Sequence, residues 1–410
     1  MKKNLLFILI LIFSIGSAGA QVDFIWGKQF GSDSDERTRN LMIDSLNNVY
    51  VVGKTRGKVG KEYFGKYDGF VVKIDSSANT KWAIQIGSKE EDDLIYPAID
   101  RSGNLYVTGY IGVGAQYKSS PDTDVLVAKI TSNGEIVWQK QYGTDSTDIG
   151  AGIAVGTDGD IYVIGSTEGV MGKTSGGKAD CFILHLDNEG TQLNVLQFGT
   201  PGDDQGYGIS TGMDSRIYVC GTTEGNMAGE NAGKSDMFWG IYSKDLKQQK
   251  MIQSGTEKYD CAVEIKTDNK NNIYIAGSTD WILVPKEKLN GDCFLQKWNE
   301  KGEISWTEQF GTGNWDGING LSVFQDKGVV VSGCMNNPMC QSFCKMYNED
   351  GSLLWSRNFI AQGGRGTCGK GVCVNRQGYI FHTGYTGANL FSDLKGVHDV
   401  FLIKLKADIK

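Results

Sequence analysis

Proline and histidine are scarce in this 410-residue chain, and its 41 basic residues are outnumbered by 48 acidic ones. Only 5 Pro occur, which excludes a collagen-like fibre and a proline-rich linker. The 3 His, at positions 185, 382 and 398, show no metal-site spacing and no adjacent nucleophile motif. The formal net charge is −7 at pH 7, so nucleic acid is a poor candidate partner. A hydrophobic fraction of 40% nonetheless predicts a folded chain.

Long apolar runs are also missing, except at the N-terminus. Two lysines precede the run from Leu5 to Phe13, and the small residues 18–20 follow it, as in a secretory signal cleaved before Gln21. The run is about half the ~20 residues of a membrane span, and no later segment could cross a bilayer. We therefore expect a signal peptide over 1–20 and one domain over 21–410, secreted, periplasmic or on the cell surface. A retained anchor is the alternative.

Glycine is abundant, with 56 residues, and much of it is periodic. The tripeptide Gln-x-Gly recurs every 56 residues, at Gly31, Gly87, Gly143, Gly199, Gly255 and Gly311. An aspartate opens an apolar segment with the same period, at Asp68, Asp124, Asp180, Asp236 and Asp292, and again at Asp399. These markers divide the chain into seven units of about 56 residues.

Each unit contains four β segments. The clearest are runs of β-branched and aromatic residues, as in Val49 to Val52, and turn pairs such as Asn133-Gly134 separate them. Helical periodicity is absent. Four antiparallel strands repeated seven times predict an all-β fold, a seven-bladed β-propeller. The Trp26 to Gly31 strand and the final Asp399 to Lys406 strand are neighbours within a unit. The N-terminal strand is therefore predicted to complete the last blade and close the ring.

The repeated motifs resemble a known family. The unit that runs from Trp138 through Gly143, the acidic turn at Asp148 and the segment Asp180-Cys-Phe-Ile-Leu is similar to the bacterial seven-bladed β-propeller repeat, SBBP. The resemblance covers nearly all of the chain after residue 20. It implies an exported propeller and no particular chemistry. Asn194 and Lys250 stand where other units have tryptophan, which predicts looser or specialised blades there.

An acidic residue lies five positions after each Gln-x-Gly glycine. We call these residues the acidic ring: Glu36, Asp92, Asp148, Asp204, Asp260 and Asp316. Carboxylates near the channel mouth of a propeller could bind a hard cation such as Ca²⁺. A residue repeated in every blade could equally accept hydrogen bonds from the backbone of a local turn. Apart from Ca²⁺ we expect no cofactor.

Tryptophan and cysteine have different distributions. Tryptophan recurs at one position of the outer strand, where it is predicted to pack between blades: Trp26, Trp82, Trp138, Trp306 and Trp355. All nine cysteines follow residue 180, and their odd number leaves at least one unpaired within the chain. Cys334 and Cys340 flank a shortened loop in the sixth unit, so we predict a disulfide between them across the hairpin.

Irregular features are the better guide to function. The long variable loops between second and third strands are predicted to share one face with the acidic ring, and their aromatic residues are candidate binding residues: Tyr63, Phe64, Tyr67, Tyr110, Tyr117 and Trp281. We expect a monomeric, non-catalytic propeller that binds a protein or glycan through this face. The alternatives are a carbohydrate-active enzyme with carboxylates at the channel mouth and a structural surface or matrix component.

Overall fold

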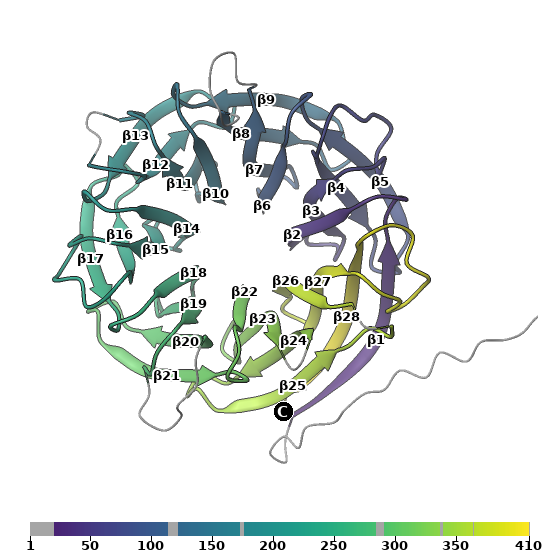
Figure 1. Ribbon diagram of the computed structural model, residues 1–410. Coiled ribbons are helices and arrows are strands. Elements are labelled where there is room, and N and C mark those ends of the chain that lie inside the picture. Colours follow the sequence, from purple (N-terminus) through teal and green to yellow (C-terminus); the bar gives the residue numbers. More distant parts are fainter. Residues whose placement is uncertain are drawn as a thin grey trace, which may run out of the picture.

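The computed structural model describes residues 20–113, 122–172, 176–283, 291–336, 339–363 and 365–409. Seven four-stranded antiparallel sheets are arranged as blades in a ring (Figure 1). No helix occurs among the described residues, so none of them forms an apolar helix long enough to cross a membrane. The predicted all-β, seven-bladed propeller is confirmed.

The first six blades each follow the chain from the innermost to the outermost strand. Blade 1 comprises β2 (Glu36–Ile43), β3 (Val49–Thr55), β4 (Asp68–Ile74) and β5 (Thr80–Ile86). Blade 2 comprises β6 (Asp93–Ile99), β7 (Leu105–Gly112), β8 (Thr123–Ile130) and β9 (Ile136–Tyr142). Blade 3 comprises β10 (Asp148–Val155), β11 (Ile161–Thr167), β12 (Asp180–Leu186) and β13 (Gln192–Phe198).

The second half of the ring repeats this order. Blade 4 comprises β14 (Asp204–Thr211), β15 (Ile217–Thr223), β16 (Asp236–Tyr242) and β17 (Gln248–Ser254). Blade 5 comprises β18 (Asp260–Thr267), β19 (Ile273–Thr279), β20 (Asp292–Trp298) and β21 (Ile304–Phe310). Blade 6 comprises β22 (Gly317–Phe324), β23 (Gly328–Asn336), β24 (Cys340–Tyr347) and β25 (Leu353–Phe359).

Blade 7 joins the two ends of the chain, as predicted. It comprises β26 (Thr367–Val374), β27 (Tyr379–Thr386), β28 (Asp399–Ile409) and, as its outermost strand, β1 (Ala20–Phe30). β1 and β28 are antiparallel, in a register that runs from Ala20 opposite Ile409 to Phe30 opposite Val400. The pairing is longer than the predicted Trp26 to Gly31 segment. It covers the edge of β28 that an open ring would leave exposed.

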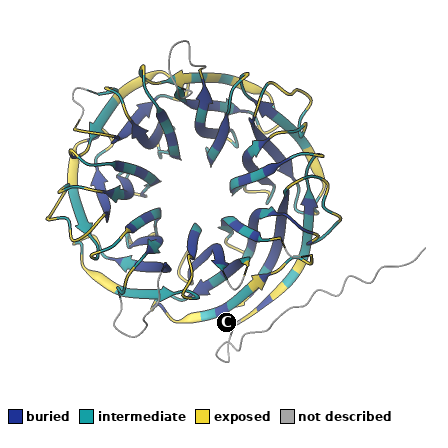
Figure 2. Cartoon of the chain, in the orientation of Figure 1, coloured by how far each residue is buried: buried dark blue, intermediate teal, exposed yellow. Residues whose placement is uncertain are grey.

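The core lies between neighbouring blades. Every residue of the central strands β4 and β12 is buried, because adjacent blades cover both faces of each sheet. An outermost strand such as β9 is exposed at alternate positions instead. Figure 2 shows this gradient from a buried interior to an exposed rim. Each hydrophobic cluster spans blades; one combines Tyr50 and Val52 of blade 1 with Leu126 of blade 2.

The outer-strand tryptophans bond neighbouring blades together. The indole N–H of Trp306 donates to the carbonyl of Glu349, in the turn between the third and fourth strands of the next blade, at 2.9 Å. Trp26, Trp82 and Trp138 make the equivalent bond at 3.1 Å. Lys250 and Asn194 also donate to that turn of the next blade, but to the carbonyls one residue further along, those of Lys301 at 2.8 Å and Asp245 at 3.4 Å. The two replacements therefore keep an interblade bond.

Candidate functional site at the loop face

Two sets of loops share one end of the ring, and we call this end the loop face. The first set joins the second and third strands of each blade, and the second leads into the innermost strands. Backbone hydrogen bonds join the two sets: the amides of Asp92 and Asp260 donate to the carbonyls of Tyr67 and Ser235. The predicted common face for the long loops and the acidic ring is thus present.

The Gln-x-Gly repeat fixes the bases of the long loops. The side-chain N–H of Gln85 donates to Asp68 at 2.9 Å, and its oxygen accepts the amides of Val59 and Gly60 in the long loop at 2.8 and 2.7 Å. Gln29, Gln197 and Gln253 bond Asp399, Asp180 and Asp236 in the same way. The strictly periodic glutamine and aspartate therefore form a scaffold beneath the variable loops.

The acidic ring lies in the turns that lead into the innermost strands. The Asp92 carboxylate is buried and accepts the amides of Ser88 at 2.6 Å and Gly112 at 2.9 Å. The same bond from the fourth residue upstream recurs at Glu36, Asp148, Asp204, Asp260 and Asp316. This geometry supports the turn-acceptor interpretation. A Ca²⁺ ion takes about six to eight oxygen ligands, and its binding here stays a prediction.

At five of the six repeated glycines the carboxylate of the acidic ring faces a second carboxylate. A Cβ atom added to Gly87 would lie 2.8 Å from oxygens of both Asp68 and Asp92. At Gly199 the corresponding distances are 2.3 Å to Asp180 and 2.9 Å to Asp204. Burial raises the pKa of Asp92 to about 6 despite its hydrogen bonds, and the charge of Asp68 adds to this increase. The glycine is periodic because a side chain would collide with the facing acids.

The predicted binding aromatics divide into exposed and structural residues. Tyr63, Phe64 and Trp281 are exposed on the loop face, at 49%, 40% and 38%. Tyr67 is buried: its hydroxyl donates to Asp35 at 2.6 Å, and the Lys54 ammonium lies 4.4 Å from its ring centre. Tyr110 is half-buried, and Tyr117 lies outside the described residues.

Two further exposed aromatic residues were not predicted from the sequence. Trp315 and Tyr259 are 62% and 49% exposed and lie in the short loops that lead into blades 6 and 5, not in the long loops. Each directly precedes a residue of the acidic ring, so both could have been identified as candidate binding residues from their position in the sequence. Among the described residues, all five exposed aromatics, Tyr63, Phe64, Tyr259, Trp281 and Trp315, lie on the loop face.

Cations accompany this aromatic surface. The Lys258 ammonium lies 5.3 Å from the centre of the Trp281 ring, and the Lys234 ammonium lies 4.7 Å from that of Tyr259. Both distances are within the range of a cation–π contact. The surface therefore offers aromatic faces for stacking and ammonium groups for hydrogen bonds.

A polar bridge crosses the axis of the ring and breaks its sevenfold symmetry. We call Tyr96, Glu264 and Lys266 the axial bridge. The Tyr96 hydroxyl, from blade 2, donates to Glu264 at 2.8 Å, and Lys266 donates to Tyr96 at 2.8 Å. Glu264 and Lys266 belong to β18 of blade 5, on a different side of the ring from β6 (Figure 1). Burial raises the pKa of Glu264, although Lys266 and the Tyr96 hydroxyl counteract it.

A cavity of about 270 Å³ adjoins the bridge, toward the loop face. We call it the upper cavity; its lining includes Arg39, Tyr96, Tyr207, Glu264, Asn319 and Lys370. Arg39 donates to Asp93 at 2.6 and 2.8 Å. No carboxylate among the described residues lies within ion-pair distance of Lys370, and burial next to Arg39 lowers its pKa to about 8. The cavity could therefore receive an acidic group.

The histidines lie in structural positions. His382 is fully buried: it contacts the Ser342 hydroxyl at 2.6 Å and the Gly371 carbonyl at 3.1 Å. Burial lowers the pKa of His382 to about 4. Because Ser342 is also fully buried, this serine–histidine pair is closed to a substrate. His185 and His398 bond Asp160 and Asp35, at 2.8 and 2.7 Å.

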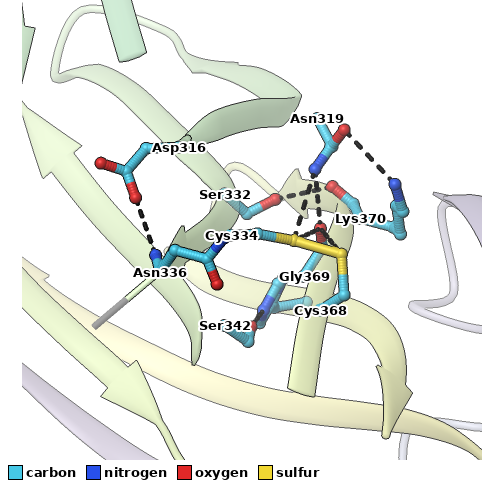
Figure 3. Close-up of a disulfide and its surroundings, with 10 residues drawn as sticks. Asp316, Asn319, Ser332, Cys334, Asn336, Ser342, Cys368, Gly369 and Lys370 are labelled. Carbon is cyan, nitrogen blue, oxygen red and sulfur yellow. Dashed lines mark hydrogen bonds between the residues drawn. A yellow bond between two sulfur atoms is a disulfide. The ribbon is translucent and has the colours of Figure 1, made fainter. Parts of the chain in front are cut away.

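The predicted Cys334–Cys340 disulfide is wrong. Cys334 is bonded to Cys368 of β26, and the bond joins blades 6 and 7 (Figure 3). In the β23–β24 ladder Cys334 is opposite Ser342, and Cys340 is opposite Asn336, so the two cysteines are diagonal neighbours. The packing of blade 7 brings Cys368 to a Cα–Cα distance of 5.2 Å from Cys334. A contact between blades could not be deduced from hairpin spacing.

Comparisons with known proteins agree with the fold. The model of the SBBP β-propeller repeat matches residues 25–59. A polysaccharide lyase of family PL25, an ulvan lyase, has a similar structure, with a TM-score of 0.59, 11% identity, and coverage of 90% of this chain and 97% of that one. The Neurospora crassa Pan2 WD40 domain has a TM-score of 0.50 and 11% identity, with coverage of 90% and 89%.

One curated relative shares part of the sequence. The regulatory protein FlaEY of Caulobacter vibrioides is 22% identical over 188 residues, which cover 43% of this chain and 19% of FlaEY. The chain thus spans about a fifth of the length of that relative. These likenesses concern the repeat and the fold. The chain carries the SBBP β-propeller repeat, and its seven blades form one closed propeller.

Proposed function

We propose that this protein is an exported binding propeller that recognises a protein or glycan through the loop face. The observation that carries the proposal is the placement of all five exposed aromatics of the described residues on that face. Tyrosine and tryptophan are favoured in binding sites because they bury a large area at little cost in side-chain entropy. The opposite end of the ring exposes aliphatic side chains such as Leu46 and Met213 but no aromatic among the described residues.

The cationic side chains in the upper cavity favour a ligand that carries an acidic group. Lys370 lacks a carboxylate partner among the described residues, and Arg39 lies in the same cavity. One of the similar structures is the PL25 ulvan lyase bound to -[GlcA(1-4)Rha3S]-, with a TM-score of 0.56 and 11% identity. A glycan that stacks on Trp281 or Trp315 and places an acidic group near Lys370 would use both features of the loop face.

The N-terminal signal and the negative charge are consistent with an exported monomer. Two measurements test this part of the proposal. The culture fractions of the source organism should contain a chain that begins at Gln21, outside the cytoplasm. Light scattering of the purified chain should give the mass of one copy. A chain with residues 1–20 still attached, held in a membrane fraction, would support the retained anchor instead.

Binding is tested on a glycan array with neutral, uronate and sulfated sugars, together with capture of extracellular proteins. We expect Trp281→Ala and Trp315→Ala each to weaken binding about tenfold, as for central aromatic contacts of other interfaces. Met213→Ala, which removes a side chain 73% exposed at the opposite end, should leave binding unchanged. Equal binding by all three variants would contradict the proposed face.

A second candidate is an enzyme that cleaves an acidic polysaccharide. The lowered pKa of Lys370 makes this amine a candidate proton acceptor, and Arg39 beside it could neutralise a uronate. The test is incubation with uronate-containing polysaccharides, followed by ultraviolet absorbance for unsaturated chain ends. Turnover that Lys370→Met abolishes would favour the enzyme. Binding without turnover favours the non-catalytic propeller.

A further inference from the structure

Three cysteine sulfur atoms meet at the junction of blades 6 and 7. The sulfurs of Cys334, Cys340 and Cys368 all lie within 4.8 Å of one another, and we call these residues the sulfur cluster. Cys334 and Cys368 are bonded to each other, whereas Cys340 keeps a free thiol. In this state the cluster offers one thiol, not three thiolate ligands for a metal. It combines a disulfide with a third sulfur that can reach it.

The cysteine that carries the free thiol is half-buried, and the two disulfide cysteines lie on strands that pack against each other. Cys340 is half-buried at the first position of β24, on the loop face, whereas Cys334 is 3% exposed. Cys334 and Cys368 lie on two packed strands, β23 and β26. The Lys370 side chain lies beside the cluster (Figure 3). Burial raises the pKa of the Cys340 thiol, and the Lys370 charge counteracts this effect.

We propose that the sulfur cluster is a thiol–disulfide exchange centre. The Cys340 thiol loses its proton to solvent, and the thiolate attacks the sulfur of Cys334 in line with the existing bond. The Cys334–Cys340 bond forms as the Cys334–Cys368 bond breaks, and Cys368 leaves as a thiolate that takes up a proton. Attack at Cys368 instead forms Cys340–Cys368 and releases Cys334. Both steps conserve electrons and need no oxidant or reductant.

Exchange would change what the disulfide holds together. The Cys334–Cys368 bond ties blade 6 to blade 7, whereas a Cys334–Cys340 bond lies within the β23–β24 hairpin. The first exchange therefore releases the covalent tie between the blades. It also moves the free thiol from β24 to β26. The centre can thus present a thiol on either of two blades, to a protein or small-molecule disulfide at the loop face.

The linkages can be read directly in the full-length protein. Pepsin digestion at low pH stops exchange because thiolates are protonated, and mass spectrometry then identifies the linked peptides. We expect wild type held near neutral pH to contain a second linkage that includes Cys340, besides Cys334–Cys368. Cys340→Ser should contain Cys334–Cys368 alone. Cys344→Ser, which removes a buried thiol, should keep the wild-type pattern. Wild type with Cys334–Cys368 alone would overturn exchange.

Two variants test the reach of each sulfur. In Cys368→Ser, glutathione disulfide should be reduced to two glutathione molecules while Cys334 and Cys340 become linked. A mixed disulfide with glutathione that persists at either cysteine would show that the sulfurs do not meet, and would overturn the proposal. If Cys368→Ser does not fold, Cys334→Ser tests the Cys340–Cys368 linkage by the same reaction.

Discussion

At the scale of single residues, the repeated glycines and acids maintain the fold, and a steric contact explains why the glycine recurs. Gly87 is one of the six Gln-x-Gly glycines, each of which precedes a residue of the acidic ring. It separates two buried carboxylates, those of Asp68 and Asp92. Those carboxylates cannot move aside, because backbone amides of Ser88, Gly112 and Phe64 hold them. The sequence repeat therefore records a contact between side chains that lie in different blades.

Gly87→Ala should consequently destabilise the protein. Its Cβ would lie 2.8 Å from both Asp68 and Asp92, and overpacking of this kind costs about 1–3 kcal/mol. The measurement is the free energy of unfolding in urea. Gly229→Ala is the matched control, because nothing lies within 4 Å of its added Cβ. Equal unfolding free energies for the two variants would contradict the steric role of Gly87.

The facing carboxylates also predict an unusual pH dependence. Because the pKa of Asp92 is raised from 3.8 to about 6, the folded state holds a proton there that the unfolded chain has lost. The contribution of Asp92 to stability therefore falls as the pH rises through that window. Asp92→Asn should gain stability relative to wild type between about pH 4 and about pH 7. Urea midpoints of both chains at the two pH values measure this gain.

An aspartate with a lowered pKa serves as the control. Hydrogen bonds from Thr191 lower the pKa of Asp187, so the difference between Asp187→Asn and wild type should stay constant over the same window. Parallel pH profiles for Asp92→Asn and wild type would contradict the prediction. The same midpoints with added Ca²⁺ test the cation alternative, since an ion between the two acids would raise the midpoint of wild type near pH 7.

At the scale of elements, the outer strands show how blades of different sequence keep one geometry. Trp306 and Trp355 occupy the same position in consecutive blades, yet only Trp306 bonds the next blade. Its acceptor lies in the turn that joins β24 and β25. The corresponding strands of blade 7 are β28 and β1, which come from opposite parts of the sequence, so no turn joins them. The Trp355 N–H accordingly has no partner among the described residues.

This difference supplies a prediction with a built-in control. Trp306→Phe removes an interblade hydrogen bond and should lower the unfolding free energy by about 1 kcal/mol more than Trp355→Phe does. Both changes remove the same atoms, but Trp355 is buried and Trp306 is only half-buried. Packing alone would therefore favour a larger loss for Trp355→Phe, so a larger loss for Trp306→Phe would be due to the bond. Urea unfolding of the two variants measures it. A larger loss for Trp355→Phe would mean that ring packing, not the hydrogen bond, determines the tryptophan at this position.

At the scale of the whole molecule, the repeated strands can be predicted from the sequence, whereas the individual contacts between residues of different blades cannot. The period, the seven blades and the closure by the N-terminal strand follow from the spacing of the motifs alone, because every unit forms the same four strands and packs against its neighbours in the same way. The Cys334–Cys368 bond and the contact of Tyr96 with Glu264 join residues of different blades, and no local pattern encodes them. Exposure of Trp315 was missed because its loop is short.

The axial bridge gives the last prediction, since it connects blades that do not touch through their sheets. The Glu264 carboxylate is 2% exposed, accepts a hydrogen bond from the Tyr96 hydroxyl and pairs with the Lys266 ammonium. Glu264→Ala therefore leaves the Lys266 charge without its partner. Loss of one partner of a buried pair costs about 3 kcal/mol. The exposed pair Lys178–Glu224 is the control, and Glu224→Ala should cost less than about 1 kcal/mol.

Glu264→Gln distinguishes charge from hydrogen bonding in the bridge. The amide oxygen can still accept the Tyr96 hydroxyl, so this variant should lose less stability than Glu264→Ala and more than Glu224→Ala, as measured by urea unfolding. If both Glu264 variants lost no more than the control, the bridge would not stabilise the ring. The closure of β1 on β28 and the tryptophan bonds between blades would then hold the seven blades together without a contact across the axis.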